Sequence, residues 1–211
     1  SCVEWLGKVP AHWEVQRLKA SVSNVVNPAT NRGSGKMCLA LEHVESWTGR
    51  IQSVAIDIGA GSQVKKFRST DVLFGKLRPY LAKVSHPKRN GICVNEFLVL
   101  RSKTKEINTN YIFYLLRSKR TIDAINASTY GVKMPRAEWS FISGLKCPLP
   151  PSSEQVSITG YLDQETAKID HVIVNIRYAI DLLKEFRTAL ISAAVTGKID
   201  VRASSGETPK G

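Results

Sequence analysis

The chain has 211 residues, of which 43% are hydrophobic and 23% charged, so it holds enough apolar side chains for one folded core and is not disordered by composition. It contains no run of about 18 apolar residues and no signal-peptide pattern. We therefore expect neither a membrane-spanning nor an exported protein, which makes the cytoplasm the default compartment. Its four cysteines lie far apart without a C-x-x-C pair, which favours reduced thiols over a zinc site or a disulfide scaffold.

The net charge of +12 is unevenly distributed along the chain. Residues 1–151 carry 23 Lys and Arg against 10 Asp and Glu, whereas residues 152–211 carry 7 against 8. A domain this basic attracts polyanions, of which DNA and RNA are the commonest, because each neutralised phosphate releases counterions. A basic surface that serves only solubility is the plain alternative. The dispersed basic residues argue against a membrane-binding patch.

The first half of the chain predicts short strands separated by loops. A short strand or helix is expected over 15–18, after a loop pinned by Trp5, Pro10 and Trp13. The segment 27–35 is loop by composition, and strands are predicted over 36–41, 51–58 and 92–101. The glycine pair that follows residue 58 is interpreted as a turn, because no basic residue or clear helix follows it as a phosphate loop would require.

Residues 71–84, DVLFGKLRPYLAKV, predict a strand or hairpin with one buried and one charged face. Its polar positions gather three cations and an aromatic ring: Lys76, Arg78, Tyr80 and Lys83. Such a face is a candidate for phosphate contacts, and a core strand with a solvated rim is the alternative.

Helical and loop segments complete the basic part. Residues 110–118 predict a helix that extends to about 125, and 128–136 predict a loop that contains Gly131, Lys133 and Arg136. A short apolar return over 141–145 leads to three prolines. These elements together predict a mixed α/β domain over 1–151.

A long helix is predicted over 152–197, since Pro150 and Pro151 precede it and Gly197 follows it. Ser152 and Gln155 match a capping box, and Gly160 marks a place where the helix could divide. Apolar or small residues recur at alternating spacings of four and three, and we call this set the seam: Leu162, Thr166, Ile169, Ile173, Ile176, Ile180, Leu183, Arg187, Leu190 and Ala194. The seam predicts coiled-coil packing on a second helix, with packing on its own domain as the alternative.

No catalytic constellation can be assembled from the sequence. A phosphate-loop motif, the amino-methyltransferase motif and the common restriction-nuclease pattern are all missing. The four histidines stand apart from carboxylates and cysteines in sequence, so we interpret them as structural or surface residues: His12, His43, His86 and His171. The sequence favours a binding module without a metal or cofactor over an enzyme.

Several segments together resemble the specificity subunit of type I restriction-modification systems. They span residues 3–202 and are VEWLGKVPAHWEVQRLK, LFGKLRPYLAKV, PLPPSSEQ, YLDQETAKID and LLKEFRTALISAAVTGKIDVR. In that family a subunit normally has two target recognition domains, each followed by a conserved long helix, and the two helices pack antiparallel as a spacer. Methyltransferase and restriction subunits supply the chemistry.

The resemblance implies an α+β fold in three parts. These are a DNA target recognition domain at 1–151, a spacer and dimerisation helix at 152–197 that pairs antiparallel with a second such helix, and a tail at 198–211. The chain has one such unit, so it resembles half a subunit, either a short version that forms a homodimer or the C-terminal half of a longer one. The expected partners are double-stranded DNA, methyltransferase and restriction subunits, and a second specificity half; no cofactor and no membrane are expected.

The implied function is to read one half of a bipartite DNA site without catalysis. The residues expected to contact DNA are Lys76, Arg78, Tyr80 and Lys83, then Lys133 and Arg136, with Arg32 and Lys36 behind them. The residues expected at the subunit interface are Leu162, Ile169, Ile173, Ile176, Ile180, Leu183 and Leu190. Two alternatives stay open: a DNA-modifying or DNA-cleaving enzyme with unrecognised motifs, and a scaffold that does not bind DNA and uses the helix only to dimerise.

Overall fold

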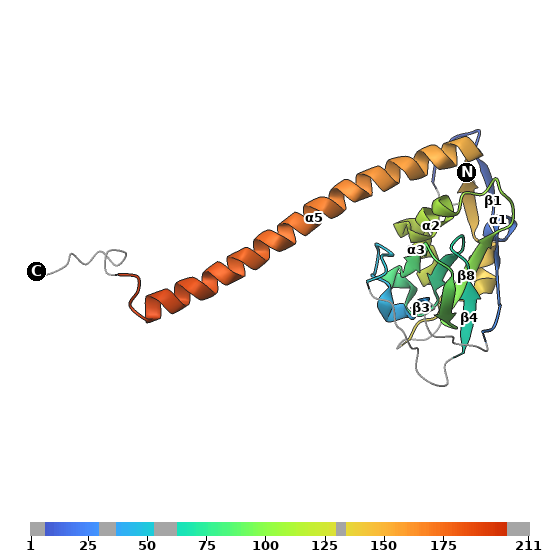
Figure 1. Cartoon of the computed structure of the whole chain (residues 1–211). Coiled ribbons are helices and arrows are strands. Elements are labelled where there is room, and N and C mark those ends of the chain that lie inside the picture. Colours follow the sequence, from blue (N-terminus) through green and yellow to red (C-terminus); the bar gives the residue numbers. More distant parts are fainter. Residues whose placement is uncertain (1–6, 30–36, 53–62, 130–133, 202–211) are drawn as a thin grey trace, which may run out of the picture. The chain divides into compact units, whose positions relative to one another are not determined.

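A computed structural model of the chain describes residues 7–29, 37–52, 63–129 and 134–201 (Figure 1). The chain divides into two units, residues 1–160 and 161–211. Three of the predicted DNA contacts, Arg32, Lys36 and Lys133, lie outside the described residues, as does most of the predicted strand over 51–58.

Three small sheets organise the described part of the first unit. The first pairs β1 (Glu14–Arg17) antiparallel with β9 (Lys146–Leu149), so the end of this unit lies beside its start. The second has the order β2 (Val22–Asn24), β8 (Phe97–Ser102), β5 (Val72–Gly75) and β6 (Val84–Ser85), all antiparallel. The third has the order β3 (Met37–Leu39), β7 (Gly91–Val94) and β4 (Val64–Phe67), with β3 parallel to β7.

The single central strand predicted over 92–101 was wrong, because this segment forms two strands in different sheets. A turn at Asn95 and Glu96 separates β7 from β8. Residues 97–100 of β8 are all at most 3% exposed, since successive side chains enter two different cores. A strand buried on both faces is continuously apolar, which hides the break that alternating polar residues would reveal.

The two cores give this unit a layered construction. Leu98 and Leu100 of β8 pack in the larger core with four helices: α1 (Leu18–Ser21), α2 (Thr109–Arg117), α3 (Lys119–Ala127) and α4 (Trp139–Gly144). Figure 1 shows α2 and α3 beside β8. Phe97 and Val99 face the smaller core, which they share with residues of β3, β4 and β7. The four-stranded sheet is therefore the middle layer.

The helix predicted from 110 to about 125 is interrupted at Ser118. Ser118 has extended backbone angles, and its Oγ accepts the N–H of Thr121 at 3.4 Å, so it ends α2 and caps α3. The apolar return expected over 141–145 belongs mostly to α4, a short helix that buries Ile142.

The predicted long helix is confirmed as α5 (Ser152–Val195), which continues through Gly160 without a break (Figure 1). Its predicted end is confirmed as well. Gly197 has φ +70°, its N–H donates to the Ala194 carbonyl at 3.2 Å, and the N–H of Lys198 donates to the Ala193 carbonyl at 2.8 Å. These two bonds form a Schellman motif.

The capping box predicted at the start of α5 was wrong. Gln155 is buried and turns to other partners: its Oε1 accepts the N–H of Asn108 at 2.8 Å, and its Nε2 donates to the Pro150 carbonyl at 2.9 Å. Asn108 in turn caps α2 by accepting the N–H of Asn110. Gln155 thus ties the first turns of α5 to the start of α2, a pairing that sequence spacing cannot reveal. Among the helices that the structure describes, none has the length and continuous apolarity needed to cross a bilayer.

Candidate nucleic-acid interface

The predicted hairpin over 71–84 is confirmed, but the predicted DNA contacts lie in its connection. Strands β5 and β6 pair antiparallel, and the short 3-10 helix η2 (Pro79–Leu81) lies between them. The sequence predicted one charged face of a strand, but the structure does not place these four residues on a common face: Lys76, Arg78, Tyr80 and Lys83. Gly75 and Lys83 close the connection through the N–H of Gly75 and the carbonyl of Lys83, 2.9 Å apart.

The connection pairs with a distant segment that also carries a predicted contact. The N–H of Arg78 donates to the Pro135 carbonyl at 2.8 Å, and the N–H of Ala137 donates to the Lys76 carbonyl at 2.9 Å. Leu77 and Arg136 are opposite each other in this antiparallel bridge. The fold thus brings Lys76, Arg78 and Arg136 onto neighbouring segments, although about 60 residues separate them in the chain.

The side chains of these residues differ in how freely they can meet a ligand. Arg78 and Tyr80 are exposed, and no ion pair engages Lys76 or Arg78 within the described part of the chain. Arg136 forms an ion pair with Glu96, with its Nη2 at 3.0 Å from Oε1. Lys83 donates from Nζ to the Leu41 carbonyl at 2.6 Å, at the start of the 3-10 helix η1 (Leu41–His43). Lys83 therefore already has a partner in the fold.

One further lysine is withdrawn from the surface. Lys65 is 5% exposed, and its Nζ donates to the carbonyl of Phe97, the first residue of β8. Burial lowers the pKa of Lys65 from its ordinary value, because desolvation disfavours the ammonium ion. This cation therefore serves the fold, whereas its neighbour Lys66 is exposed.

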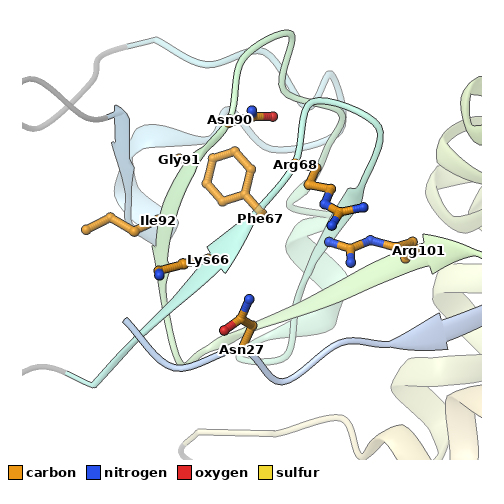
Figure 2. A pocket seen from close by; sticks show the side chains of 8 residues that line it. All are labelled: Asn27, Lys66, Phe67, Arg68, Asn90, Gly91, Ile92 and Arg101. Atoms are coloured by element: carbon orange, nitrogen blue, oxygen red, sulfur yellow. The ribbon is translucent and has the colours of Figure 1, made fainter. Parts of the chain in front are cut away.

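The structure also gathers basic residues that the sequence reasoning did not single out. A hollow of about 320 Å³ lies where β4 ends, β7 begins and β8 nears its end, and its lining is Asn27, Lys66, Phe67, Arg68, Asn90, Gly91, Ile92 and Arg101 (Figure 2). We call it the basic hollow. The sequence of β4, Val-Lys-Lys-Phe, has no alternation that would separate the buried Lys65 from the exposed Lys66, so no local signal pointed to this hollow.

The seam of α5 is uncovered in the second unit. Ile169, Ile176 and Leu183 are 59%, 53% and 66% exposed, and other apolar side chains of the same helix are exposed too, among them Val172, Val174, Tyr178, Phe186 and Ile191. Leu162 and Ile173 are half-buried. A contiguous apolar surface of this length is typical of a protein interface.

Comparison with protein families gives a match that extends over both units. The family described as "Type I restriction modification DNA specificity domain" matches residues 63–175. That range includes the hairpin connection, the basic hollow apart from Asn27, and the first part of the seam.

Similar proteins include two specificity subunits. That of the type I restriction enzyme EcoDI from Escherichia coli is 27% identical over 164 residues, which are 76% of this chain and 36% of that protein. That of MjaVIII from Methanocaldococcus jannaschii is 22% identical over 195 residues, which are 90% of this chain and 43% of that protein.

Solved structures show the same fold. The HsdS subunit from Thermoanaerobacter tengcongensis has a TM-score of 0.66 and 23% identity, covering 78% of this chain and 45% of that one. A chain from a study of complex assembly and conformational transition of the type I R-M system has a TM-score of 0.71 and 23% identity, covering 97% and 53%. The chain therefore spans about half the length of these relatives, or less.

Proposed function

The chain belongs to the type I restriction modification DNA specificity family, and from this membership we propose that it reads one half of a bipartite DNA site. Methyltransferase and restriction subunits, in this proposal, bind the chain and supply the chemistry. The observation that carries the DNA part is the pairing of residues 76–78 with 135–137, which places Lys76, Arg78 and Arg136 together in the unit that holds all the excess positive charge.

The proposed contacts differ in their exposure and in the partners they already have. Arg78 and Tyr80 are exposed and lie at the tip of the hairpin connection, where they suit base edges or the phosphates beside them. Arg136 is exposed as well but is paired with Glu96, and Lys76 is half-buried; both suit phosphate contacts, which fix the position of the duplex. Lys83 bonds the hairpin connection to the start of η1. It is therefore expected to affect DNA binding indirectly, by fixing the position of the connection.

The proposed role of α5 is to hold two reading units apart. Its 44 residues extend about 65 Å at 1.5 Å per residue. A seam that packs antiparallel on a second such helix would place one recognition domain at each end. The length of the helix would then set the separation of the two half-sites.

Salt-dependent DNA binding tests this proposal. The purified chain is titrated into a fluorescein-labelled duplex of mixed sequence, and anisotropy is read over a series of salt concentrations. The logarithm of the association constant is expected to fall linearly with the logarithm of salt, with a slope of about −0.9 for each phosphate neutralised. Arg78→Gln is expected to weaken binding about tenfold.

The alternatives predict different results in the same samples. An affinity for DNA that is absent or unchanged across the salt series would contradict the proposal and favour a dimerising scaffold. Cleavage or methylation of the duplex by the chain alone, with a divalent metal or a methyl donor added, would favour an enzyme.

A further inference from the structure

We propose that the basic hollow binds the phosphate backbone of duplex DNA, as a second contact separate from the hairpin connection; this inference rests on the proposed function. Three cationic side chains line it, those of Lys66, Arg68 and Arg101, and its lining contains no carboxylate (Figure 2). Within the described residues, no ion pair engages Lys66 or Arg68. An anion is therefore the class of ligand that this lining favours.

A buried carboxylate prepares Arg101 for such a ligand. Asp71 is fully buried, and its Oδ1 and Oδ2 accept from Nε and Nη2 of Arg101, each at 2.7 Å. A guanidinium has five N–H donors, so this bidentate pair leaves the others available to the hollow. The bond with Asp71 also raises the pKa of Arg101 above its ordinary value. Arg101 is thus held in place before any ligand arrives, which reduces the entropy lost on binding.

The same carboxylate positions the second arginine. Asp71 Oδ2 accepts the main-chain N–H of Arg68 at 2.8 Å, which fixes the turn between β4 and β5. Figure 2 shows the guanidinium groups of Arg68 and Arg101 on the same side of the hollow. Asp71 compensates the charge of Arg101, whereas the side chain of Arg68 has no ion-pair partner among the described residues, so its charge is available to an anion.

A second turn brings further positive charge to this edge. Asn90 Oδ1 accepts the N–H of Ser69 at 2.8 Å, which joins the turn before β7 to the turn after β4. Lys88 and Arg89 immediately precede Asn90 and are exposed. The amide nitrogen of Asn90 is left as a donor on the rim of the hollow.

The floor of the hollow favours a phosphate over a nucleobase. Phe67 and Ile92 are 3% and 2% exposed, so neither offers an aromatic or apolar face on which a base could stack. Gly91 packs so closely that a Cβ there would lie 2.4 Å from the Met37 carbonyl oxygen. The polar groups in the lining are the ammonium and guanidinium groups of its cations and the side-chain amides of its asparagines, which are usual partners of phosphate oxygens.

The lining also favours a duplex backbone over a free anion. Sites for free phosphate commonly use several main-chain N–H groups at a helix N-terminus. Here the N–H groups of Arg68 and Ser69 are already bonded to Asp71 and Asn90. The available donors are instead long, exposed side chains, which suit the extended surface of a duplex.

The hollow and the hairpin connection lie at opposite ends of the same strands. Asp71 precedes β5 and Lys76 follows it, while Arg101 lies near the far end of β8. The five residue steps from Asp71 to Lys76 extend about 17 Å, which is of the same order as the width of the major groove, about 12 Å. One duplex could therefore contact both regions through phosphates on either side of a groove.

A matched pair of double variants of the full chain tests the hollow. Lys66→Gln with Arg68→Gln removes two charges from it, and Arg17→Gln with Lys105→Gln removes two exposed charges elsewhere. In the anisotropy titration the first double variant is expected to lose at least tenfold in affinity, with a salt slope reduced by about 0.9 or more. The second is expected to keep the slope of the parent chain. Thermal melts of all three proteins confirm that they are folded.

Each other outcome contradicts the inference in a recognisable way. Equal losses in both double variants would mean that only the total charge matters. If inorganic phosphate shifts NMR resonances around Arg101 in the parent but DNA affinity is the same in the first variant, the hollow binds a small free anion instead. If the parent binds DNA and the first variant binds it equally well, the basic hollow does not contact DNA, while the proposed function stands. A parent chain that does not bind DNA overturns both.

Discussion

Asp71 holds two of the three cationic residues of the basic hollow in position. Its carboxylate is fully buried and bonds to both the guanidinium of Arg101 and the main-chain N–H of Arg68. Asp71→Asn keeps an oxygen acceptor but removes the charge that compensates Arg101. We expect the free energy of unfolding to fall by about 3 kcal/mol, since breaking one partner of a buried pair leaves the other uncompensated. Urea unfolding followed by circular dichroism measures it.

An exposed ion pair provides the control for this prediction. Asp123 pairs with Lys119 one helical turn away on α3, where the side chains are 59% and 76% exposed. Asp123→Asn is expected to change the free energy of unfolding by less than about 0.5 kcal/mol. Equal effects of the two substitutions would show that the Asp71 pair does not stabilise the fold.

At the scale of elements, the seam of α5 makes a prediction about self-association. Ile176 and Ile180 are 53% and 45% exposed and lie one turn apart on the seam. If the seam pairs with a second copy, the parent chain is a dimer. Ile176→Asp with Ile180→Asp then yields a monomer, because the paired helices would bury four carboxylates. Light scattering gives the solution mass of both proteins.

The opposite face of the same helix supplies a matched control. Val174 and Tyr178 have the same spacing and are 56% and 66% exposed, but they lie about half a turn away from the seam. Val174→Asp with Tyr178→Asp is expected to leave the dimer intact. If this control variant is monomeric too, the dimer interface is not confined to the seam, which contradicts the prediction. A parent chain that is monomeric from the start would rule out self-pairing and leave the seam for a different partner.

At the scale of the whole molecule, self-pairing predicts the symmetry of the target. Two identical reading units related by a two-fold axis bind two identical half-sites in opposite orientation. We therefore expect selection of bound duplexes from a random library to recover a split palindrome with a constant spacer. The seam variant is expected to select one half-site without a fixed spacer. An undivided or asymmetric target for the parent chain would contradict the homodimer.

Features that depend on local backbone constraints could be predicted from the sequence. The ends of α5 are set by prolines that exclude a helix interior and by a glycine that adopts a positive φ, so both were predicted to within two residues. The seam followed from a helical period, and the charge difference between the two parts followed from counting. The division between β7 and β8 was missed, because a strand buried on both faces carries no alternation.

Only the tertiary structure decided which charged groups meet and which stay on the surface. Neighbouring Lys65 and Lys66 look alike in the sequence, yet one is buried on main-chain carbonyls and the other lines the basic hollow. Asp71 and Arg101 are 30 residues apart, and Lys76 and Arg136 twice that. The sequence by itself determined the kind of protein, a basic domain followed by a long helix with an apolar seam. The fold determined its candidate site, because contacts between distant segments depend on strand pairing and on burial, which no local pattern contains.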